Sequence, residues 1–426
     1  MNKVIKRARH IQGTITVPGD KSVSHRALMF GAIAEGDTII RQLSHGQDVQ
    51  STRHCLEACG VRFTEKDDHI VVHGQGLHLK EPDGVLDAGN SGTTMRLFSG
   101  ILATQKFNST ITGDDSLSKR PMNRIITPLK QMGASIQSKD GFPPLMIQGQ
   151  PLNPIHYQSP VASAQVKSCV LIAGLFCDGI TSVSEPHLSR DHTERMLPCF
   201  DVPVHREGLI VSLTGPAHLK GTNILVPGDI SSAAFFMVAA SLIPNSRLTI
   251  QNVGMNPSRT GIFDVLKAMG GHITDENSRI ENGEPISDLV IETSSLHGTT
   301  IEGDIIPKLI DELPLLAVAA TQAKGRTIIR DAKELRVKES DRITAVADNL
   351  KRMGCNVQTT DDGFIIDGPQ KLQGATLPTY HDHRIAMSFA IAGLLANGST
   401  TIENAETAEV SFPDFYFLLE RVSDNG

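Results

Sequence analysis

Two near-identical stretches decide how the chain is organised: GTITVPGDKS at residues 13–22 and GTNILVPGDISS at residues 221–232. Each has the pattern of a short strand, followed by a Pro-Gly turn and the polar start of a helix. We expect the chain to cross between two domains at these points. Residues 19–227 are therefore assigned to one continuous domain, and residues 1–18 with 228–426 to a second, discontinuous one.

Both stretches open one copy of a pattern that recurs along the chain. Each copy has a polar or glycine-rich start, an apolar segment of helical length, a turn and, in most copies, a strand rich in Thr and Ile. The copies are GDKSVSHRALMFGAIAEGDTII (19–40), GNSGTTMRLFSGILAT (89–104), SAQVKSCVLIAGLFCDGITSV (163–183), GDISSAAFFMVAASLIPNSRLTI (228–250), DELPLLAVAATQAKGRTII (311–329) and HDHRIAMSFAIAGLLANGSTTI (381–402). Segments that are apolar on all sides predict helices buried on all sides.

Amphipathic segments lie between most of these copies, at residues 125–137, 262–274 and 343–358. Each ends in a Gly turn and a short alternating strand. One repeat is thus a β-α-β-α-β-β unit, and six units divide into two domains of three. The predicted fold class is α/β (α+β), with two similar domains that are linked by a hinge and enclose an interdomain cleft.

The composition excludes several classes of function. The chain has 40 Lys and Arg against 47 Asp and Glu, a net charge of −7, so the total charge does not indicate a nucleic acid or an acidic membrane as partner. The basic N-terminus lacks the apolar run of a signal peptide, and no apolar stretch is long enough to span a bilayer. The six cysteines show no CxxC spacing. We expect a cytoplasmic protein with reduced thiols and no metal.

Basic residues gather at the starts of the expected helices. Helix N-termini present unpaired N–H groups and a partial positive charge, and so favour anions. Capping by polar residues is the simpler reading of these starts, but it does not account for repeated Lys and Arg. We expect a compact ligand that carries phosphate and carboxylate groups. The basic residues are Lys21, Arg26, Arg96, Lys119, Arg120, Lys167, Arg336, Lys338, Arg342, His383 and Arg384.

Two other readings of these motifs are weaker. GDKS resembles the end of a phosphate-binding P-loop, but Asp20 separates Gly19 from Lys21. His381 and His383 lack a third ligand at metal-binding spacing, and we interpret His383 as an active-site imidazole.

Two carboxylates are candidates for acid–base chemistry. Asp311 begins a strongly apolar segment and is expected at the mouth of a buried helix. A helix through RVKESDR (336–342) would place Lys338, Glu339 and Arg342 on one face. Carboxylates held near cations and away from water are suited to proton transfer.

These motifs together resemble the 5-enolpyruvylshikimate-3-phosphate (EPSP) synthase family over the whole chain. The resemblance rests on GDKSVSHR, GNSGTTMR, KRP, SAQ, RVKESDR and DHR in this order. It implies two similar domains that close on shikimate 3-phosphate and phosphoenolpyruvate, with no cofactor. The enolpyruvyl group would pass to the 5-hydroxyl through a tetrahedral intermediate, with release of phosphate, as a step toward chorismate and the aromatic amino acids.

The resemblance also implies roles for individual residues. The catalytic residues would be Lys21, Asp311 as the base, and Glu339, with Glu339 or Lys21 as the acid. Shikimate 3-phosphate would be bound by Lys21, Ser22, Arg26, Ser163, Ala164, Gln165, Arg190, Asp311 and Lys338. Phosphoenolpyruvate would be bound by Lys21, Gly92, Arg120, Gln165, Arg342 and Arg384.

The chain departs from the best-known form of the family at several motifs. GNSGTTMRL, SAQVK and SRDHTE differ from the usual residues, and Val410 and Ser411 precede Phe412-Pro413 where a lysine is usual. These features resemble the second class, often tolerant of glyphosate, a possible inhibitor. We expect a monomer. The alternatives are UDP-N-acetylglucosamine enolpyruvyl transferase, whose loop cysteine is absent from residues 113–123, and a two-domain protein that only binds a phosphorylated metabolite.

Overall fold

In the computed structural model, which describes residues 1–425, the chain divides into two units. We call residues 1–18, 228–279 and 285–426 the terminal unit, because it contains both ends of the chain. Residues 19–227 with 280–284 form the central unit. Each unit has its own hydrophobic core, and each is described by itself.

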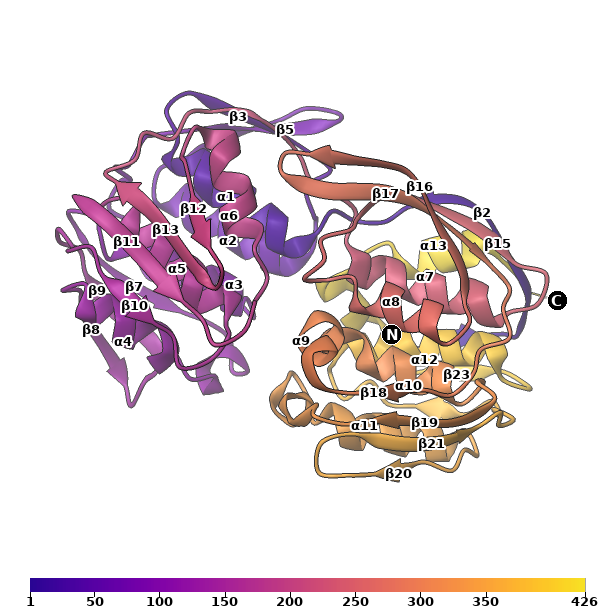
Figure 1. Cartoon of the computed structure of the whole chain (residues 1–426). Coiled ribbons are helices and arrows are strands. Elements are labelled where there is room, and N and C mark those ends of the chain that lie inside the picture. Colours follow the sequence, from indigo (N-terminus) through magenta and orange to yellow (C-terminus); the bar gives the residue numbers. More distant parts are fainter. Residues whose placement is uncertain (426) are drawn as a thin grey trace. The chain divides into compact units, whose positions relative to one another are not determined.

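Three apolar helices form the centre of each unit, as Figure 1 shows. In α7 every residue from Ile230 to Ser241 is buried. This burial confirms the prediction that segments without a polar face lie inside the units. The central unit contains α1 (Lys21–Ile33), α3 (Gly92–Leu102) and α5 (Ala164–Gly174), and the terminal unit contains α7 (Ile230–Leu242), α10 (Leu313–Ala320) and α12 (His383–Leu395).

Three of the sheets share one strand order. The strand before the apolar helix pairs in parallel with the strand after it, and an antiparallel hairpin completes the sheet. The first consists of β6 (Leu86–Asp87), β7 (Asn108–Thr112), β9 (Phe142–Gln148) and β8 (Ser135–Lys139); the second of β10 (His156–Gln158), β11 (Gly179–Ser184), β13 (Ile210–Gly215) and β12 (His205–Glu207); the third of β18 (Thr300–Ile301), β19 (Gly325–Ile329), β21 (Phe364–Gly368) and β20 (Gln358–Thr359). This order is the predicted β-α-β-α-β-β unit, and the mixed α/β class is confirmed.

Each of the two near-identical stretches contributes its strand to one unit and the helix that follows to the other unit. The strand before α1, β2 (Ala8–Thr16), pairs in parallel with β15 (Arg247–Gly254) in the terminal unit. The strand before α7, β14 (Asn223–Leu225), pairs in parallel with β3 (Asp37–Arg41) in the central unit. Each unit therefore completes one sheet with the strand that precedes a helix of the other unit.

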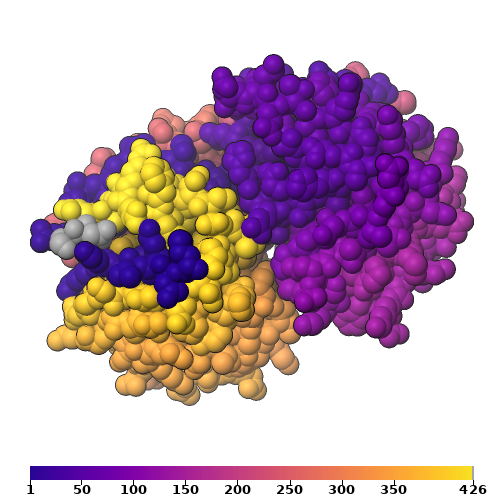
Figure 2. Space-filling model, turned by 180° about the vertical axis from the view of Figure 1, so that it is seen from behind, coloured from indigo at the N-terminus to yellow at the C-terminus, as the bar shows by residue number. Residues whose placement is uncertain are grey.

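The second helices of the repeats are amphipathic or polar and cover the apolar ones. The three predicted as amphipathic are α4 (Asn123–Gln131), α8 (Gly261–Ala268) and α11 (Arg342–Arg352), and two other repeats have α2 (Gln47–Ala58) and α6 (His192–Met196) at this position. The last repeat has β22 (Thr376–Leu377) and β23 (Thr400–Ile402), and β1 (Lys3–Ile5) pairs with β23 in place of a hairpin. Figure 2 shows the indigo start of the chain lying against the yellow C-terminal region, and the amino group of Met1 pairs with Glu406.

A long hairpin of the terminal unit, β16 (His272–Glu281) and β17 (Glu284–Glu292), has its tip grouped with the central unit. Glu284 Oε1 lies 2.8 Å from His192 Nδ1, and both side chains are buried. The sequence reading assigned the tip to the other domain, because a hairpin tip carries no local sign of where it packs.

The six cysteines are free thiols, five of them buried. Among residues 1–425, no helix is both long and apolar enough to cross a membrane.

Candidate active site

A buried guanidinium group lies among the charged residues of the terminal unit. Arg342 is the first residue of α11, and its side chain is 1% exposed. Its Nε lies 2.8 Å from Asp382 Oδ2, and its Nη2 lies 2.6 Å from Glu339 Oε2. Its Nη1 lies 3.2 Å from Asp311 Oδ1. Burial would lower the pKa of Arg342, but the three carboxylates outweigh burial and raise it.

Arg342 also keeps its neighbours ionised. Burial would raise the pKa of Glu339, but the charge of Arg342 outweighs burial and holds this pKa below its usual range. The pKa of Asp382 is lowered against burial in the same way, mainly by Arg342. Glu339 is therefore a carboxylate in the ligand-free protein, and it cannot give up a proton until its surroundings change.

Asp311 is a partly exposed acidic candidate that lies beside two site cations. It lies in the 3₁₀ turn Ile310–Glu312 that precedes the buried helix α10, as predicted. Its Oδ1 lies 3.4 Å from Lys338 Nζ as well as 3.2 Å from Arg342 Nη1, and the side chain is 21% exposed. A partly exposed carboxylate between two cations is within reach of a ligand.

The helix predicted through residues 336–342 is wrong. The helix α11 begins only at Arg342, and Asp341 caps it by accepting from the Thr344 N–H at 3.2 Å. A capping side chain requires non-helical backbone at its own position, which ends any helix before it. Glu339 still reaches Arg342, but Lys338 lies in extended backbone, and it shares the carboxylate of Asp311 with Arg342.

The start of α12 carries a second arginine. Asp382 caps the helix and accepts from the Arg384 N–H at 2.8 Å. Arg384 Nη1 lies 3.6 Å from Glu312 Oε1, and its guanidinium carbon lies 5.8 Å from the centre of the Phe235 ring. His383, between the two, is 7% exposed, and burial lowers its pKa to about 4. At neutral pH it is an uncharged imidazole.

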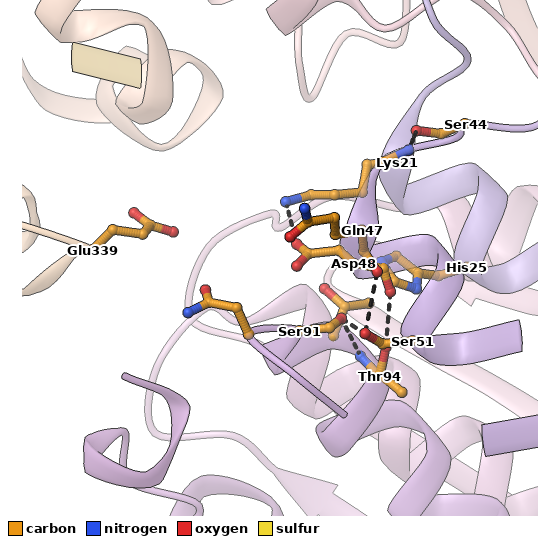
Figure 3. Close-up of polar contacts among 12 residues, drawn as sticks. Lys21, His25, Ser44, Gln47, Asp48, Ser51, Ser91, Thr94 and Glu339 are labelled. Atoms are coloured by element: carbon orange, nitrogen blue, oxygen red, sulfur yellow. Dashed lines mark hydrogen bonds and ion pairs between the residues drawn. The ribbon is translucent and has the colours of Figure 1, made fainter. Parts of the chain in front are cut away.

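In the central unit the first site residue is paired with a carboxylate. Lys21 opens α1, and its Nζ lies 2.9 Å from Asp48 Oδ2 in the first turn of α2 (Figure 3). The two side chains are 35% and 13% exposed. An anionic ligand at Lys21 would therefore share the ammonium group with Asp48.

Behind this pair, a chain of buried hydrogen bonds connects three helices (Figure 3). His25 Nδ1 lies 2.6 Å from Thr52 Oγ1, and Thr52 Oγ1 lies 2.6 Å from Thr94 Oγ1. Thr94 Oγ1 donates to Ser91 Oγ at 2.6 Å. Burial lowers the pKa of His25 to about 3, so its ring is neutral. These hydrogen bonds hold the first turns of α1 and α3 against the middle of α2.

Arg26 is a buried cation on the same helix as Lys21. Its Nε donates to Thr193 Oγ1 at 2.7 Å, its Nη2 to Ser168 Oγ at 2.7 Å, and its Nη1 to the Ser22 carbonyl at 2.8 Å. Burial is the main cause that lowers its pKa to about 10, which leaves it charged at neutral pH.

The starts of α3 and α5 are joined through Gln165. Its Oε1 accepts from Arg96 Nη1 at 2.6 Å, and its Nε2 donates to Thr93 Oγ1 at 3.0 Å. Ser163 caps α5, and Ala164 is the first residue of that helix. The amide of Gln165 is thereby held in one orientation beside α3.

Gly92 is the first residue of α3 and lies against two guanidinium groups. A Cβ added at this position would lie 2.9 Å from Arg96 Nη1 and 3.7 Å from Arg120 Nη1. Arg120 Nη2 donates to Asn90 Oδ1 at 2.9 Å in the turn before the helix. Glycine therefore allows the close approach of both cations to the helix N-terminus.

The predicted site residues fall into two sets, one in each unit. Arg190 lies half-buried at the end of the loop that follows β11. The central unit holds Lys21, Ser22, Arg26, Gly92, Arg120, Ser163, Ala164, Gln165 and Arg190, and the terminal unit holds Asp311, Lys338, Glu339, Arg342 and Arg384. Lys167, expected among the anion-binding cations, lies 2.8 Å from both Glu185 and Glu194, with its side chain 1% exposed. That expectation is wrong, because two buried carboxylates already neutralise the ammonium group.

The sequence analysis missed the acidic partners. Asp48 and Glu312 each lie beside a predicted cation, and Arg96 was noted as a cation without its role in holding Gln165. Asp48 follows no repeat motif, so no local signal marks it. Glu312 is adjacent to Asp311, and a second carboxylate at the start of so apolar a helix is a signal that could have been used.

Comparison with solved structures identifies the fold. The structure superimposes on an enolpyruvyl transferase from Streptomyces tendae with a TM-score of 0.80 at 18% identity, covering 99% of this chain and 97% of that one. This likeness defines the fold of the enolpyruvyl transferases. A solved structure of EPSP synthase from Acinetobacter baumannii matches with a TM-score of 0.91 at 49% identity, covering 99% and 98% of the two chains.

Sequence comparison then defines the family. The profile of EPSP synthase (3-phosphoshikimate 1-carboxyvinyltransferase) matches residues 5–419. The chain is 56% identical to the 3-phosphoshikimate 1-carboxyvinyltransferase of Brevibacillus brevis, over 98% of this chain and 99% of that one. It is 55% identical to the enzyme of the same name from Bacillus cereus, over 97% of each chain. The chain belongs to the EPSP synthase family, and it is a transferase of the shikimate pathway.

Proposed function

We propose that the two sets of site residues carry out the reaction of this family, transfer of the enolpyruvyl group of phosphoenolpyruvate to the 5-hydroxyl of shikimate 3-phosphate. The observation that carries the proposal is the arrangement around Arg342, which holds Asp311 and Glu339 on one guanidinium group. A protein that only binds a phosphorylated metabolite needs the cations but not two reactive carboxylates.

The proposed assignment of substrates follows the chemistry of the residues. Arginine suits phosphate and carboxylate because its planar group donates two parallel hydrogen bonds. Shikimate 3-phosphate is assigned to Lys21, Ser22, Arg26, Ser163, Ala164, Gln165, Arg190, Asp311 and Lys338. Phosphoenolpyruvate is assigned to Lys21, Gly92, Arg120, Gln165, Arg342 and Arg384.

In the proposed mechanism, the 5-hydroxyl oxygen bonds to C2 of phosphoenolpyruvate as Asp311 accepts the hydroxyl proton. The C3 methylene takes a proton from Glu339 or Lys21, which gives a tetrahedral intermediate. Loss of a C3 proton and of phosphate then restores the double bond. Because Glu339 is ionised beside Arg342, we propose that the negative charge of bound phosphoenolpyruvate offsets Arg342 and raises the proton affinity of Glu339.

Turnover tests this function directly. The purified chain should release phosphate from shikimate 3-phosphate with phosphoenolpyruvate, measured by a coupled phosphate assay. It should release none from UDP-N-acetylglucosamine with phosphoenolpyruvate. Release only with the second pair would support the sister transferase, and binding of shikimate 3-phosphate without any release would support a binding protein.

Glyphosate is proposed to occupy the phosphoenolpyruvate site, and Gly92→Ala tests this. The added methyl group would press on the Arg96 guanidinium group and lie in van der Waals contact with that of Arg120. Overpacking costs about 1–3 kcal/mol, or roughly 5- to 150-fold in affinity. We expect the glyphosate inhibition constant to rise at least about tenfold, and KM for phosphoenolpyruvate to rise less, because the inhibitor fills the site more tightly along its length.

Gly84→Ala is the matched control for this change. No atom lies within 4 Å of a Cβ added at Gly84, so neither constant should move. Equal factors on the inhibition constant and on KM in Gly92→Ala, or no effect on either, would show that Gly92 does not line the pocket. The ratio of the two changes is the quantity to compare, since an already tolerant enzyme starts from a high inhibition constant.

A further inference from the structure

A buried group of charges in the central unit lies next to residues assigned to shikimate 3-phosphate. Lys167, one turn into α5, places its Nζ 2.8 Å from Glu185 Oε2 and 2.8 Å from Glu194 Oε1. The three side chains are 1%, 3% and 7% exposed. A buried ion pair is seldom the most stable filling of a core, because desolvation offsets much of the attraction. The burial of these three charges therefore points to a role other than stability.

Both carboxylate oxygens of Glu185 accept hydrogen bonds from residues at or next to the positions assigned to shikimate 3-phosphate. Its Oε1 accepts from the Ser163 N–H at 2.8 Å, at the start of α5. Its Oε2 accepts from Ser189 Oγ at 2.8 Å, in the residue before Arg190. Lys167 holds the same oxygen from inside the unit. One carboxylate thus connects the backbone at Ser163 with the loop that carries Arg190.

Glu194 differs from Glu185 in its contacts. It forms an ion pair with Lys167, as Glu185 does. The residue before it in the sequence, Thr193, accepts a hydrogen bond from Arg26. No hydrogen bond from Glu194 to Ser163 or to Ser189 is found among residues 1–425. Both glutamates therefore form an ion pair with Lys167. Among the described residues, Glu185 is the one of the two that also contacts Ser163 and Ser189.

We propose that Glu185 is a positioning residue for shikimate 3-phosphate, which holds Ser163 and the Ser189–Arg190 loop at their binding distance from each other. This inference rests on the proposed function, because it takes Ser163 and Arg190 as ligands of that substrate. Glu185 itself need not touch the substrate. Lys167 fixes its carboxylate from the buried side.

The test compares Glu185→Gln with Glu194→Gln. Both changes remove one negative charge from Lys167 and keep the shape of the side chain. In Glu185→Gln we expect KM for shikimate 3-phosphate to rise about tenfold or more, because a neutral amide weakens the charge-assisted hydrogen bonds that hold Ser163 and Ser189. KM for phosphoenolpyruvate and kcat should change by less than about threefold. Glu194→Gln should lower thermal stability to a similar extent and change KM for shikimate 3-phosphate far less.

Equal increases of KM in the two variants would overturn the proposal, because charge loss at Lys167 would then suffice. If Glu185→Gln does not fold, Ser189→Ala removes one of the two contacts from a half-buried loop and should raise the same KM about threefold. An unchanged KM in that variant also counts against the proposal. If the unaltered chain neither binds nor turns over shikimate 3-phosphate, the proposed function fails instead, which calorimetry on that chain shows separately.

Discussion

Replacing Asp311 by alanine is expected to lower kcat by about 10²- to 10⁴-fold, the range for loss of a general base, with a smaller change in either KM. The carboxylate is partly exposed and lies between Lys338 and Arg342, where a ligand can reach it. Asp311→Asn should lose as much activity, because an amide has the same shape but cannot take up the hydroxyl proton. Steady-state phosphate release measures both variants.

Glu334 provides the control for charge. Its Oε1 lies 3.8 Å from Lys338 Nζ, and its side chain is 65% exposed. Glu334→Gln removes a carboxylate from Lys338 without removing the proposed base, and kcat should stay within about twofold. A loss like that of Asp311→Asn would assign the effect to the charge balance at Lys338. An unchanged kcat in Asp311→Ala would remove Asp311 from the mechanism.

The parts of the fold that follow from local pattern could be predicted. A segment such as 230–242 is too apolar to have a side that faces solvent, so it is predicted as a buried helix. The polar residues before it, such as Asp229, predict where the helix begins. The exchange of β2 and β14 between sheets could not be predicted, because it is a choice of partner between two strands of nearly the same sequence. The hairpin tip at 280–284 likewise packs by contacts far apart in the chain.

The same limit applies to the candidate site. Basic residues at helix starts were found because position in a helix is local, and the motifs of the family placed the two acidic residues. Which cation meets which carboxylate is set by tertiary packing, so Lys21 with Asp48 and Lys167 with Glu185 could not be predicted. For this reason Lys167 was wrongly predicted to bind an anion. The local sequence around a lysine at a helix start is the same whether its ammonium group faces a ligand or is neutralised in the core.

Stability is expected to fall as the pH is lowered from 7 to 5, because two buried histidines are neutral in the folded chain. Burial is the main cause that lowers the pKa of His25 to about 3 and that of His383 to about 4, against an unfolded value of 6.5. A group whose folded pKa is depressed binds its proton first in the unfolded state. Its stabilising contribution is present above pH 6.5 and is lost as the pH falls toward the folded pKa.

The expected size follows from linkage. Over this pH range each histidine should reduce the free energy of unfolding by about 2 kcal/mol, and both together by about 4 kcal/mol. The carboxylates Glu339 and Asp382, whose pKa values are lowered, lose their contributions only at lower pH, below their unfolded values of 4.5 and 3.8. The interval from pH 7 to pH 5 therefore isolates the histidines. Urea unfolding at the two pH values measures the change.

Single variants assign the effect, because the two histidines lie in different units. His25 is in the central unit beside Asp48, Lys21 and Arg26, and His383 is in the terminal unit. Glutamine at either position keeps a polar side chain that does not titrate, so His25→Gln and His383→Gln should each remove about 2 kcal/mol of the pH-dependent change, whatever they do to stability at pH 7. If the units unfold in separate transitions, each variant should flatten the pH dependence of one transition only. If the free energy of unfolding depends on pH in both variants as it does in the unaltered chain, these imidazoles take up their protons equally in the folded and unfolded states, and the explanation is wrong.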